Sequence, residues 1–169
     1  VTVEEQAEGF SLRMEGFTPP EGKKTLEQRA AEAFFAELGR PAPGLVVSIE
    51  KNTPAYAGMG GGSADAAAVL RALNKHYGDP LSILALAELG AQVGSDVPFC
   101  VGGGTQLVCG RGEVLTPLKE VPKCTFLIVK PKESFSTAEM YARLEVCRAE
   151  NDEDGIDFLE NAILSVMAV

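Results

Sequence analysis

Long hydrophobic runs are missing from this 169-residue sequence. No apolar stretch reaches the roughly 18 residues that a membrane-spanning helix needs. The first ten residues, VTVEEQAEGF, lack the pattern of a secretory signal, and the sequence has no internal repeat or low-complexity tract. With 46% hydrophobic and 23% charged residues, the composition predicts a soluble globular protein without a membrane partner.

Positive charge is scarce, because 15 Lys and Arg residues stand against 24 Asp and Glu residues, for a formal net charge of −9. The basic residues do not cluster, and an acidic chain repels nucleic acids and anionic lipids. We therefore expect no nucleic-acid partner. A small anionic ligand is still compatible with this charge, because a local group of backbone N–H donors outweighs a distant field.

Cysteine pairs typical of zinc sites are also absent. The four cysteines, Cys100, Cys109, Cys124 and Cys147, form no C-x-x-C motif, and the single histidine is not close to any of them in the sequence, which argues against a zinc site. Cys100, Cys109 and Cys124 stand in apolar, strand-like runs. We expect them to be buried thiols of a protein in a reducing cytoplasm.

Hydrophobic periodicity and turn residues predict an α+β fold. Thr25, with Gln28 three residues later, predicts a capping box at the start of a helix. Prolines and charged residues at 118–123 mark a domain boundary. The expected strands are 45–49, 97–101, a hairpin of 105–109 and 113–115, 125–129 and two around Gly9 in 1–15; the expected helices are 25–38, 66–77, 81–89, one capped by Ser136 and 156–169.

The most informative stretch is GMGGGSADAAA at 58–68, where glycines run directly into an alanine-rich helical pattern. Bare backbone N–H groups at a helix start form a site for anions, above all phosphate. The alternative is a flexible glycine turn that happens to precede a helix. Glycine costs conformational entropy on folding, so a run of this length favours the phosphate site.

Two common phosphate motifs do not fit this stretch. A P-loop requires Lys after its last Gly, where Ser63 stands, and the dinucleotide fingerprint requires a third Gly at that same position. Ser63 could bind a phosphate or cap the helix. Asp65 could bind a nucleotide or metal, but an interaction with the helix dipole in the first turn is favoured. The predicted nucleotide-binding residues are Pro54, Gly58, Gly60, Gly61, Gly62, Ser63 and Asp65.

The segment GSDVPF at 94–99 contains the candidate catalytic carboxylate, Asp96. A carboxylate between a small-residue turn and a buried strand is held rigidly and partly desolvated, which suits a group that accepts or orients a hydroxyl proton. It could equally stabilise the turn by accepting backbone N–H bonds. The residues alone do not decide between the two roles.

Thr137 and Tyr141 are candidate substrate contacts, because residues four apart on a helix share a face. An aromatic ring there could stack on a nucleobase. From the residues alone, ordinary core packing is the favoured interpretation of Tyr141.

The pattern from Pro54 to Ala67 resembles the second motif of the GHMP kinases (galactokinase, homoserine kinase, mevalonate kinase and relatives). The triple glycine and the following Asp-Ala-Ala resemble one branch, which acts on a cytidine diphosphate-linked polyol. Its G-[AS]-D-V-P-F segment matches 94–99, and its following strand and hairpin resemble 102–105 and 110–113. Ala64 stands where that branch usually has a second serine, so no role is carried over to Ala64.

The resemblance implies ATP-dependent phosphorylation of a hydroxyl group of that polyol, in isoprenoid precursor synthesis, with Mg²⁺. Asp96 would be the catalytic base, Thr137 would lie near the substrate, and Tyr141 would pack against the cytosine. The implied location is the cytoplasm, or the plastid stroma of a plant. The pattern indicates neither the metal ligands nor an oligomeric state.

The resemblance also implies a two-domain architecture. Residues 1–120 would be the ATP-binding domain without its opening, lysine-bearing segment, and 121–169 the beginning of the second domain. The family's third glycine motif is not in the sequence, so we expect a part of a longer kinase, with little or no activity alone. The alternatives are a GHMP kinase for another alcohol, a nucleotide-binding module without catalysis, and an α+β interaction domain.

Overall fold

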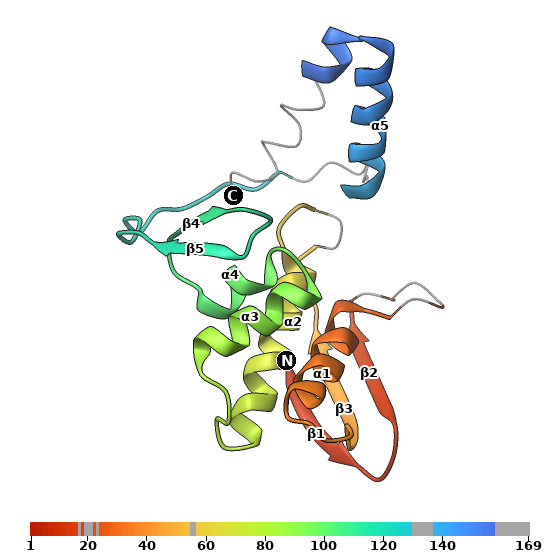
Figure 1. Cartoon of the computed structure of the whole chain (residues 1–169), viewed down its shortest axis with the longest axis vertical. Helices are drawn as coiled ribbons and strands as arrows, with labels where there is room; N and C mark the ends of the chain where they lie inside the picture. The colour runs from red at the N-terminus through yellow and green to blue at the C-terminus, as the bar shows by residue number, and fades with distance from the viewer. Residues whose placement is uncertain (17, 19–21, 23, 55–56, 130–136, 158–169) are drawn as a thin grey trace. The chain divides into compact units, whose positions relative to one another are not determined.

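The structure is a computed structural model, and it describes residues 1–16, 18, 22, 24–54, 57–129 and 137–157 (Figure 1). The chain divides into two compact units. Unit 1 comprises Val1–Asn52 and Gly60–Cys124, and unit 2 comprises Thr53–Met59 and Thr125–Val169. No helix of the described residues is long and apolar enough to cross a membrane. The assignment of 1–120 and 121–169 to two family domains stays a prediction.

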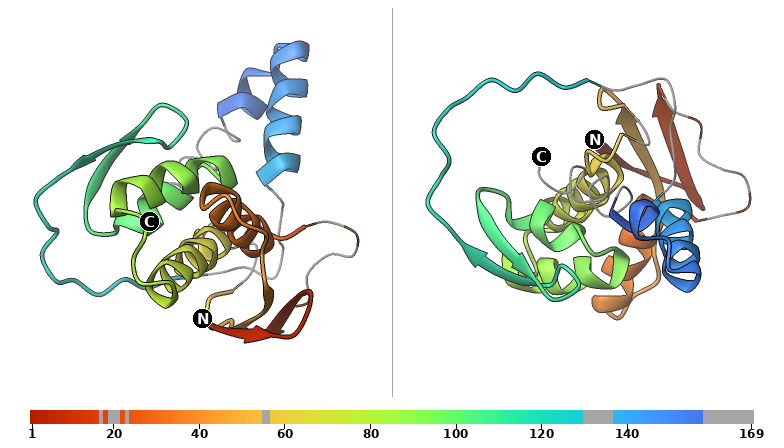
Figure 2. Two further views of the ribbon diagram at one scale, coloured as in Figure 1. Left: turned by 60° about the horizontal axis from the view of Figure 1, so that its bottom comes forward. Right: turned by 90° about the horizontal axis from the view of Figure 1, so that it is seen from above.

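Unit 1 contains a three-stranded sheet of β1 (Thr2–Gln6), β2 (Phe10–Glu15) and β3 (Gly44–Glu50). The central strand, β3, pairs antiparallel with β1 and parallel with β2. Alternate residues of β3 enter the core, and in both views of Figure 2 the helices of unit 1 lie on one side of this sheet. The two predicted strands around Gly9 are confirmed.

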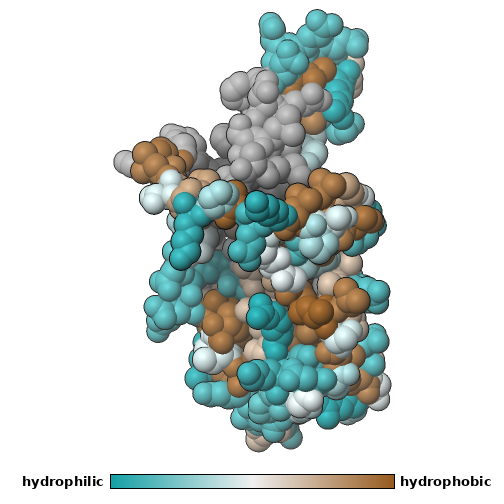
Figure 3. All heavy atoms as spheres, turned by 90° about the vertical axis from the view of Figure 1, so that its left-hand side faces the viewer, coloured by the Kyte–Doolittle hydropathy of each residue, from teal (hydrophilic) through white to brown (hydrophobic). Residues whose placement is uncertain are grey.

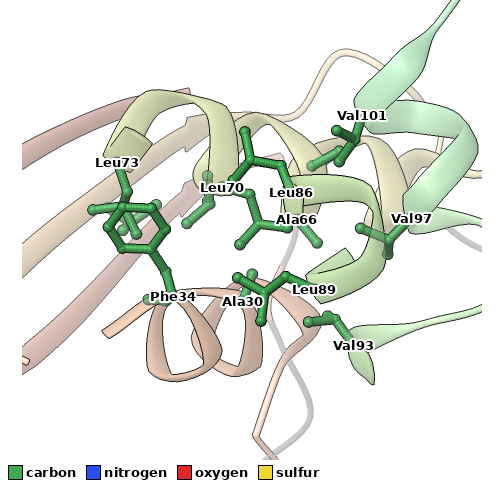
Figure 4. Close-up of a cluster of buried hydrophobic side chains, with 14 of the residues drawn as sticks. Ala30, Phe34, Ala66, Leu70, Leu73, Leu86, Leu89, Val93, Val97 and Val101 are labelled. Atoms are coloured by element: carbon green, nitrogen blue, oxygen red, sulfur yellow. The ribbon is translucent and has the colours of Figure 1, made fainter. Parts of the chain in front are cut away.

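Three helices supply most of the core: α1 (Leu26–Glu37), α2 (Gly61–His76) and α3 (Ile83–Val93). The predicted capping box is confirmed, because the Gln28 amide donates to Thr25 Oγ1 at 3.3 Å and the Thr25 amide to Gln28 Oε1 at 3.0 Å. The buried apolar faces of the helices meet in one cluster (Figure 4). Its members include Ala30, Phe34, Ala66, Leu70, Leu73, Leu86, Leu89, Val93, Val97 and Val101.

The predicted strand at 97–101 is wrong, because this segment is helix α4 (Val97–Gly102). A short apolar run does not by itself distinguish a buried strand from a buried helix. Pro98 has no N–H to donate to a ladder but is well placed in the first turn of a helix. Val97 and Val101, four residues apart, are both buried on the same helical face.

The predicted hairpin is confirmed as β4 (Gln106–Cys109) and β5 (Val114–Pro117). The predicted burial of Cys109 and Cys124 is wrong, because both are exposed and Cys100 is only half-buried. A two-stranded hairpin has no second layer to cover its side chains. On the face drawn in Figure 3, hydrophobic residues lie among hydrophilic ones at the surface.

In unit 2, the predicted strand at 125–129 is not found among the described residues, where this segment is irregular. Its apolar side chains are exposed, with Leu127 at 91%. Strand propensity alone does not form a strand, because the backbone N–H and C=O groups need a neighbouring strand as their hydrogen-bond partner. The helix predicted after Ser136 is confirmed as α5 (Thr137–Glu150), although Ser136 itself lies outside the described residues. Most of the helix predicted at 156–169 also lies outside them.

Tyr77 closes the C-terminal end of α2 and links it to β1. Its hydroxyl donates to Glu5 Oε1 at 2.7 Å, its ring stacks on Phe34, and the Arg40 guanidinium lies 4.2 Å from the ring centroid. Burial, followed by the bond to Glu5, raises the pKa of Tyr77 to about 12. The side chain therefore stays protonated well beyond the range in which free tyrosine ionises.

We expect one tyrosine of the three to ionise near pH 12 in an absorbance titration of the folded protein. Because the folded-state pKa of Tyr77 is raised, its contribution to stability is complete below about pH 10 and is lost as the pH rises toward 12. Tyr77→Phe should remove the late step and flatten this part of the stability profile. A late step that persists in Tyr77→Phe would contradict the assignment.

Candidate active site

The glycine run forms the beginning of α2, five residues earlier than the sequence pattern predicted. Gly60 is the N-cap, with φ +63°, and provides no side-chain capping bond. Glycine occupies this left-handed conformation without strain. The first N–H groups of a helix have no acceptor within the helix, so the amides of 61–63 are available to an anion. Ser63 is the third helical residue and not the cap, so its capping interpretation is wrong.

Asp65 lies in the second turn of α2 and forms an ion pair with Lys51, just beyond the end of β3. The expected interaction with the helix dipole in the first turn is therefore wrong. Both side chains are largely buried, with exposed fractions of 8% for Lys51 and 19% for Asp65. Sequence analysis missed Lys51, because the pair joins the end of a strand to a helix and no periodic spacing connects them. A role of Asp65 in nucleotide binding stays a prediction.

Pro54 and Gly58 belong to the short segment Thr53–Met59 of unit 2. Both are exposed. Gly58 has φ +67°, a conformation that glycine adopts without steric cost. Their predicted roles at the nucleotide stay predictions.

Asp96 precedes α4, at its N-cap position, and is exposed rather than partly desolvated as predicted. Its side chain makes no capping hydrogen bond, so the alternative role of turn stabilisation by this carboxylate finds no support. Among the described residues, no hydrogen bond or ion pair engages the carboxylate. A carboxylate without a protein partner is free to accept a hydrogen bond from a ligand hydroxyl.

One leucine side chain connects the start of α2 with the segment that leads into Asp96. A Cβ atom at Gly62 would lie 3.5 Å from Leu26 Cδ1, and one at Gly94 would lie 3.8 Å from Leu26 Cδ2. Helix α4 also packs against α2 and α3 (Figure 2). The start of α2 and the segment that leads into Asp96 therefore lie against the same leucine side chain in unit 1.

The charge of Asp96 affects its neighbour one helical turn later. Burial, and after it the Asp96 carboxylate, raise the pKa of the Cys100 thiol above its usual value. The described residues contain no cluster of three or more metal-ligating side chains. Mg²⁺ in nucleotide sites is held by only one or two carboxylates together with phosphate oxygens, so its binding would not require such a cluster.

The predicted substrate contacts lie on α5. Thr137 is the first residue of this helix, and Tyr141 follows one turn later, as the spacing predicted. The exposed fraction of Tyr141 is 47%, so its interpretation as a core residue is wrong. An exposed aromatic ring is available for stacking, and the roles of both residues at the substrate stay predictions.

Comparison with known proteins places residues 25–104 in a match to the family model "GHMP kinases N terminal domain". The chain is 46% identical over 127 residues to 4-diphosphocytidyl-2-C-methyl-D-erythritol kinase of Geobacillus thermodenitrificans, covering 75% of the chain and 43% of the relative. It is 48% identical over 120 residues to the enzyme of the same name from Desulfitobacterium hafniense, covering 71% and 41%. The matched part of the chain thus covers less than half the length of these relatives.

Solved structures show the same likeness. A crystal structure of 4-(cytidine 5'-diphospho)-2C-methyl-D-erythritol kinase aligns with a TM-score of 0.60 at 30% identity, over 85% of this chain and 50% of that one. Homoserine kinase from Cytophaga hutchinsonii aligns with a TM-score of 0.63 at 16% identity, over 97% and 59%. The second likeness concerns the fold alone.

Proposed function

The chain belongs to the GHMP kinase family, and from this membership we propose that it is the nucleotide-binding part of a small-molecule kinase. The proposed reaction is ATP-dependent phosphorylation of the 2-hydroxyl of 4-diphosphocytidyl-2-C-methyl-D-erythritol, a step in non-mevalonate isoprenoid precursor synthesis. The names of the similar bacterial enzymes support this substrate. They also favour a cytoplasmic location over the plastid alternative.

The observation that carries the proposal is the pairing of two features in unit 1. Helix α2 begins at glycines with no side-chain cap, and Asp96, whose carboxylate has no hydrogen-bond partner among the described residues, follows a segment that shares the Leu26 side chain with the start of α2. Phosphoryl transfer requires little covalent chemistry from the protein, which has mainly to position the reactants and offset charge. These two features meet both requirements.

In the proposed mechanism, the first-turn amides of α2 hold the β- and γ-phosphates of ATP with the positive end of the helix dipole. The carboxylate of Asp96 accepts the proton of the substrate 2-hydroxyl while the oxygen of that hydroxyl bonds to the γ-phosphorus. The bond from the γ-phosphorus to the bridging oxygen breaks, and ADP leaves. Mg²⁺, when bound, would offset the negative charge of the phosphates.

In this proposal, residues of unit 2 recognise the cytidine. Tyr141, exposed on α5, offers a ring for stacking on the cytosine, and Thr137 lies on the same helix one turn earlier. Stacking of a base on an aromatic side chain contributes about 1–3 kcal/mol. An acceptor without the cytosine should therefore have a lower kcat/KM, while the affinity for ATP changes less.

A comparison of acceptors tests the function in the full-length protein of this reading frame. We expect transfer from ATP to the cytidine-linked acceptor, and a kcat/KM roughly 5- to 150-fold lower for the same polyol phosphate without cytidine, as the loss of one stacked base implies. Preference for an unrelated alcohol would identify a different GHMP kinase. Nucleotide binding without transfer would identify a non-catalytic module, and no calorimetric heat with an ATP analogue and Mg²⁺ would favour an interaction domain.

A further inference from the structure

The turn between β4 and β5 packs closely against Ser95, the residue before Asp96. Gly112 in this turn has φ +116°, and a Cβ atom there would overlap the carbonyl oxygen of Ser95 and lie 2.8 Å from its carbonyl carbon. Gly112 is buried although its neighbours in the turn are exposed. Only a residue without a side chain allows this approach of two main chains.

The turn is itself internally constrained. The Arg111 amide donates to Glu113 Oε2 at 2.7 Å, the Gly112 amide donates to the Cys109 carbonyl at 3.2 Å, and Cys109 pairs with Val114 across the hairpin. A turn fixed by three such interactions is a firm surface for the Ser95 peptide.

The other side of the Asp96 segment is held by helix packing. Val97, which follows Asp96, is fully buried, and a Cβ atom at Gly90 would lie 2.9 Å from Val97 Cγ1, so α3 and α4 are in close contact. The Gly94 amide donates to the Gly90 carbonyl at 3.0 Å. The two peptides that flank Asp96 thus rest on the helices on one side and on the turn on the other.

The Asp96 carboxylate has no hydrogen-bond partner among the described residues, so the backbone alone fixes the Cα and Cβ atoms from which this side chain reaches a ligand. We propose that Gly112 is a positioning residue for Asp96, because its contact with the Ser95 carbonyl fixes the peptide that carries the carboxylate. The catalytic consequence rests on the proposed function, whereas the positioning itself does not. A base displaced by about 1 Å can lower turnover by roughly 10²-fold.

The first test compares Gly112→Ala with Gly78→Ala in the full-length enzyme. Both glycines have positive φ, +116° at Gly112 and +80° at Gly78, so both variants carry backbone strain, but a Cβ at Gly78 would meet nothing within 4 Å. We expect Gly112→Ala to lower kcat by about 10- to 100-fold with KM for ATP within about two-fold. Gly78→Ala should retain most of the wild-type kcat.

The second test needs no kinase activity. The charge of Asp96 contributes to the raised pKa of the Cys100 thiol, so a displaced carboxylate should change that pKa. The measurement is the pH dependence of Cys100 alkylation, with the other three cysteines replaced by serine. We expect Gly112→Ala to shift the Cys100 pKa toward the value in Asp96→Asn, and Gly78→Ala to leave it at the wild-type value.

The two readouts separate the possible failures. An unchanged kcat together with an unchanged Cys100 pKa in folded Gly112→Ala overturns the positioning role. A changed Cys100 pKa with an unchanged kcat supports the positioning role and instead removes Asp96 from the catalytic step. If Gly112→Ala does not fold, Ser95→Gly makes the same peptide more flexible without adding an atom. A decrease in kcat, smaller than that expected for Gly112→Ala, supports the proposal. A wild-type kcat together with a wild-type Cys100 pKa contradicts it.

Discussion

Asp96→Asn is expected to lower kcat by about 10²–10⁴-fold, the range typical of a lost general base, while the affinity for an ATP analogue stays within about two-fold. Asparagine keeps the shape of the side chain but does not accept the hydroxyl proton. The substitution adds little strain, because the carboxylate makes no capping bond and is exposed to solvent. Steady-state turnover and calorimetric titration with an ATP analogue measure the two quantities separately.

Glu88→Gln is the matched control for this variant. Glu88 is exposed on α3, and its replacement removes one negative charge, as Asp96→Asn does, so it reports the effect of net charge alone. We expect wild-type kcat for Glu88→Gln. Asp96→Asn with more than half of wild-type turnover would exclude Asp96 as the base and leave the glycine-started helix as a binding site only.

The parts of the fold that the sequence predicted are those that local interactions determine. The capping box of Thr25 and Gln28 and the hairpin across 110–112 depend on residues within a few positions of each other. Such contacts leave a periodic or positional signal in the sequence. The central strand β3 was also predicted, because its β-branched residues suit a buried position in a sheet.

The errors arose where tertiary contacts decide. The apolar run 97–101 fits a strand or a helix equally well, and burial of Val97 and Val101 on one face against α2 and α3 selects the helix. The glycines of 61–62 have low helix propensity, yet α2 begins there, and the Ala64 amide donates to the Gly60 carbonyl at 2.9 Å to close its first turn. Segment 125–129 has strand propensity but no partner among the described residues.

The candidate site follows the same division. The glycine run and Asp96 were found from the sequence because their residue types form motifs, whereas Lys51 belongs to none and was missed. Its role depends on a buried partner 14 positions away, which only the path of the chain brings close. A lysine just beyond a buried strand is a usual exposed residue, so nothing in the pattern distinguishes it.

Lys51→Met should lower the free energy of unfolding by about 2–3 kcal/mol, near the lower end for a broken buried ion pair, because Asp65 retains some exposure. For a chain of this size the melting temperature should fall by roughly 4–12 °C. The Asp65 charge would remain in a largely buried position without its counter-ion. Chemical denaturation monitored by circular dichroism measures the effect.

Lys24→Met is the control, since Lys24 forms an ion pair with Glu32 at 2.8 Å in which both side chains are more than half exposed. Such surface pairs contribute about 0–1 kcal/mol. The double variant Lys51→Met with Asp65→Asn should recover part of the lost stability, because no uncompensated charge is left. A loss in Lys51→Met no greater than in Lys24→Met would show that the buried pair contributes no more than the exposed one.

The Lys51–Asp65 pair also bears on function. It joins the end of β3 to the second turn of α2, and therefore anchors the segment 60–64 that begins α2. Ordering this segment before the nucleotide arrives reduces the entropy lost on binding. Lys51→Met should thus also weaken binding of an ATP analogue, measured by calorimetry well below the melting temperature of the variant, whereas Lys24→Met should not. Equal affinities in the two variants would confine the pair to a structural role.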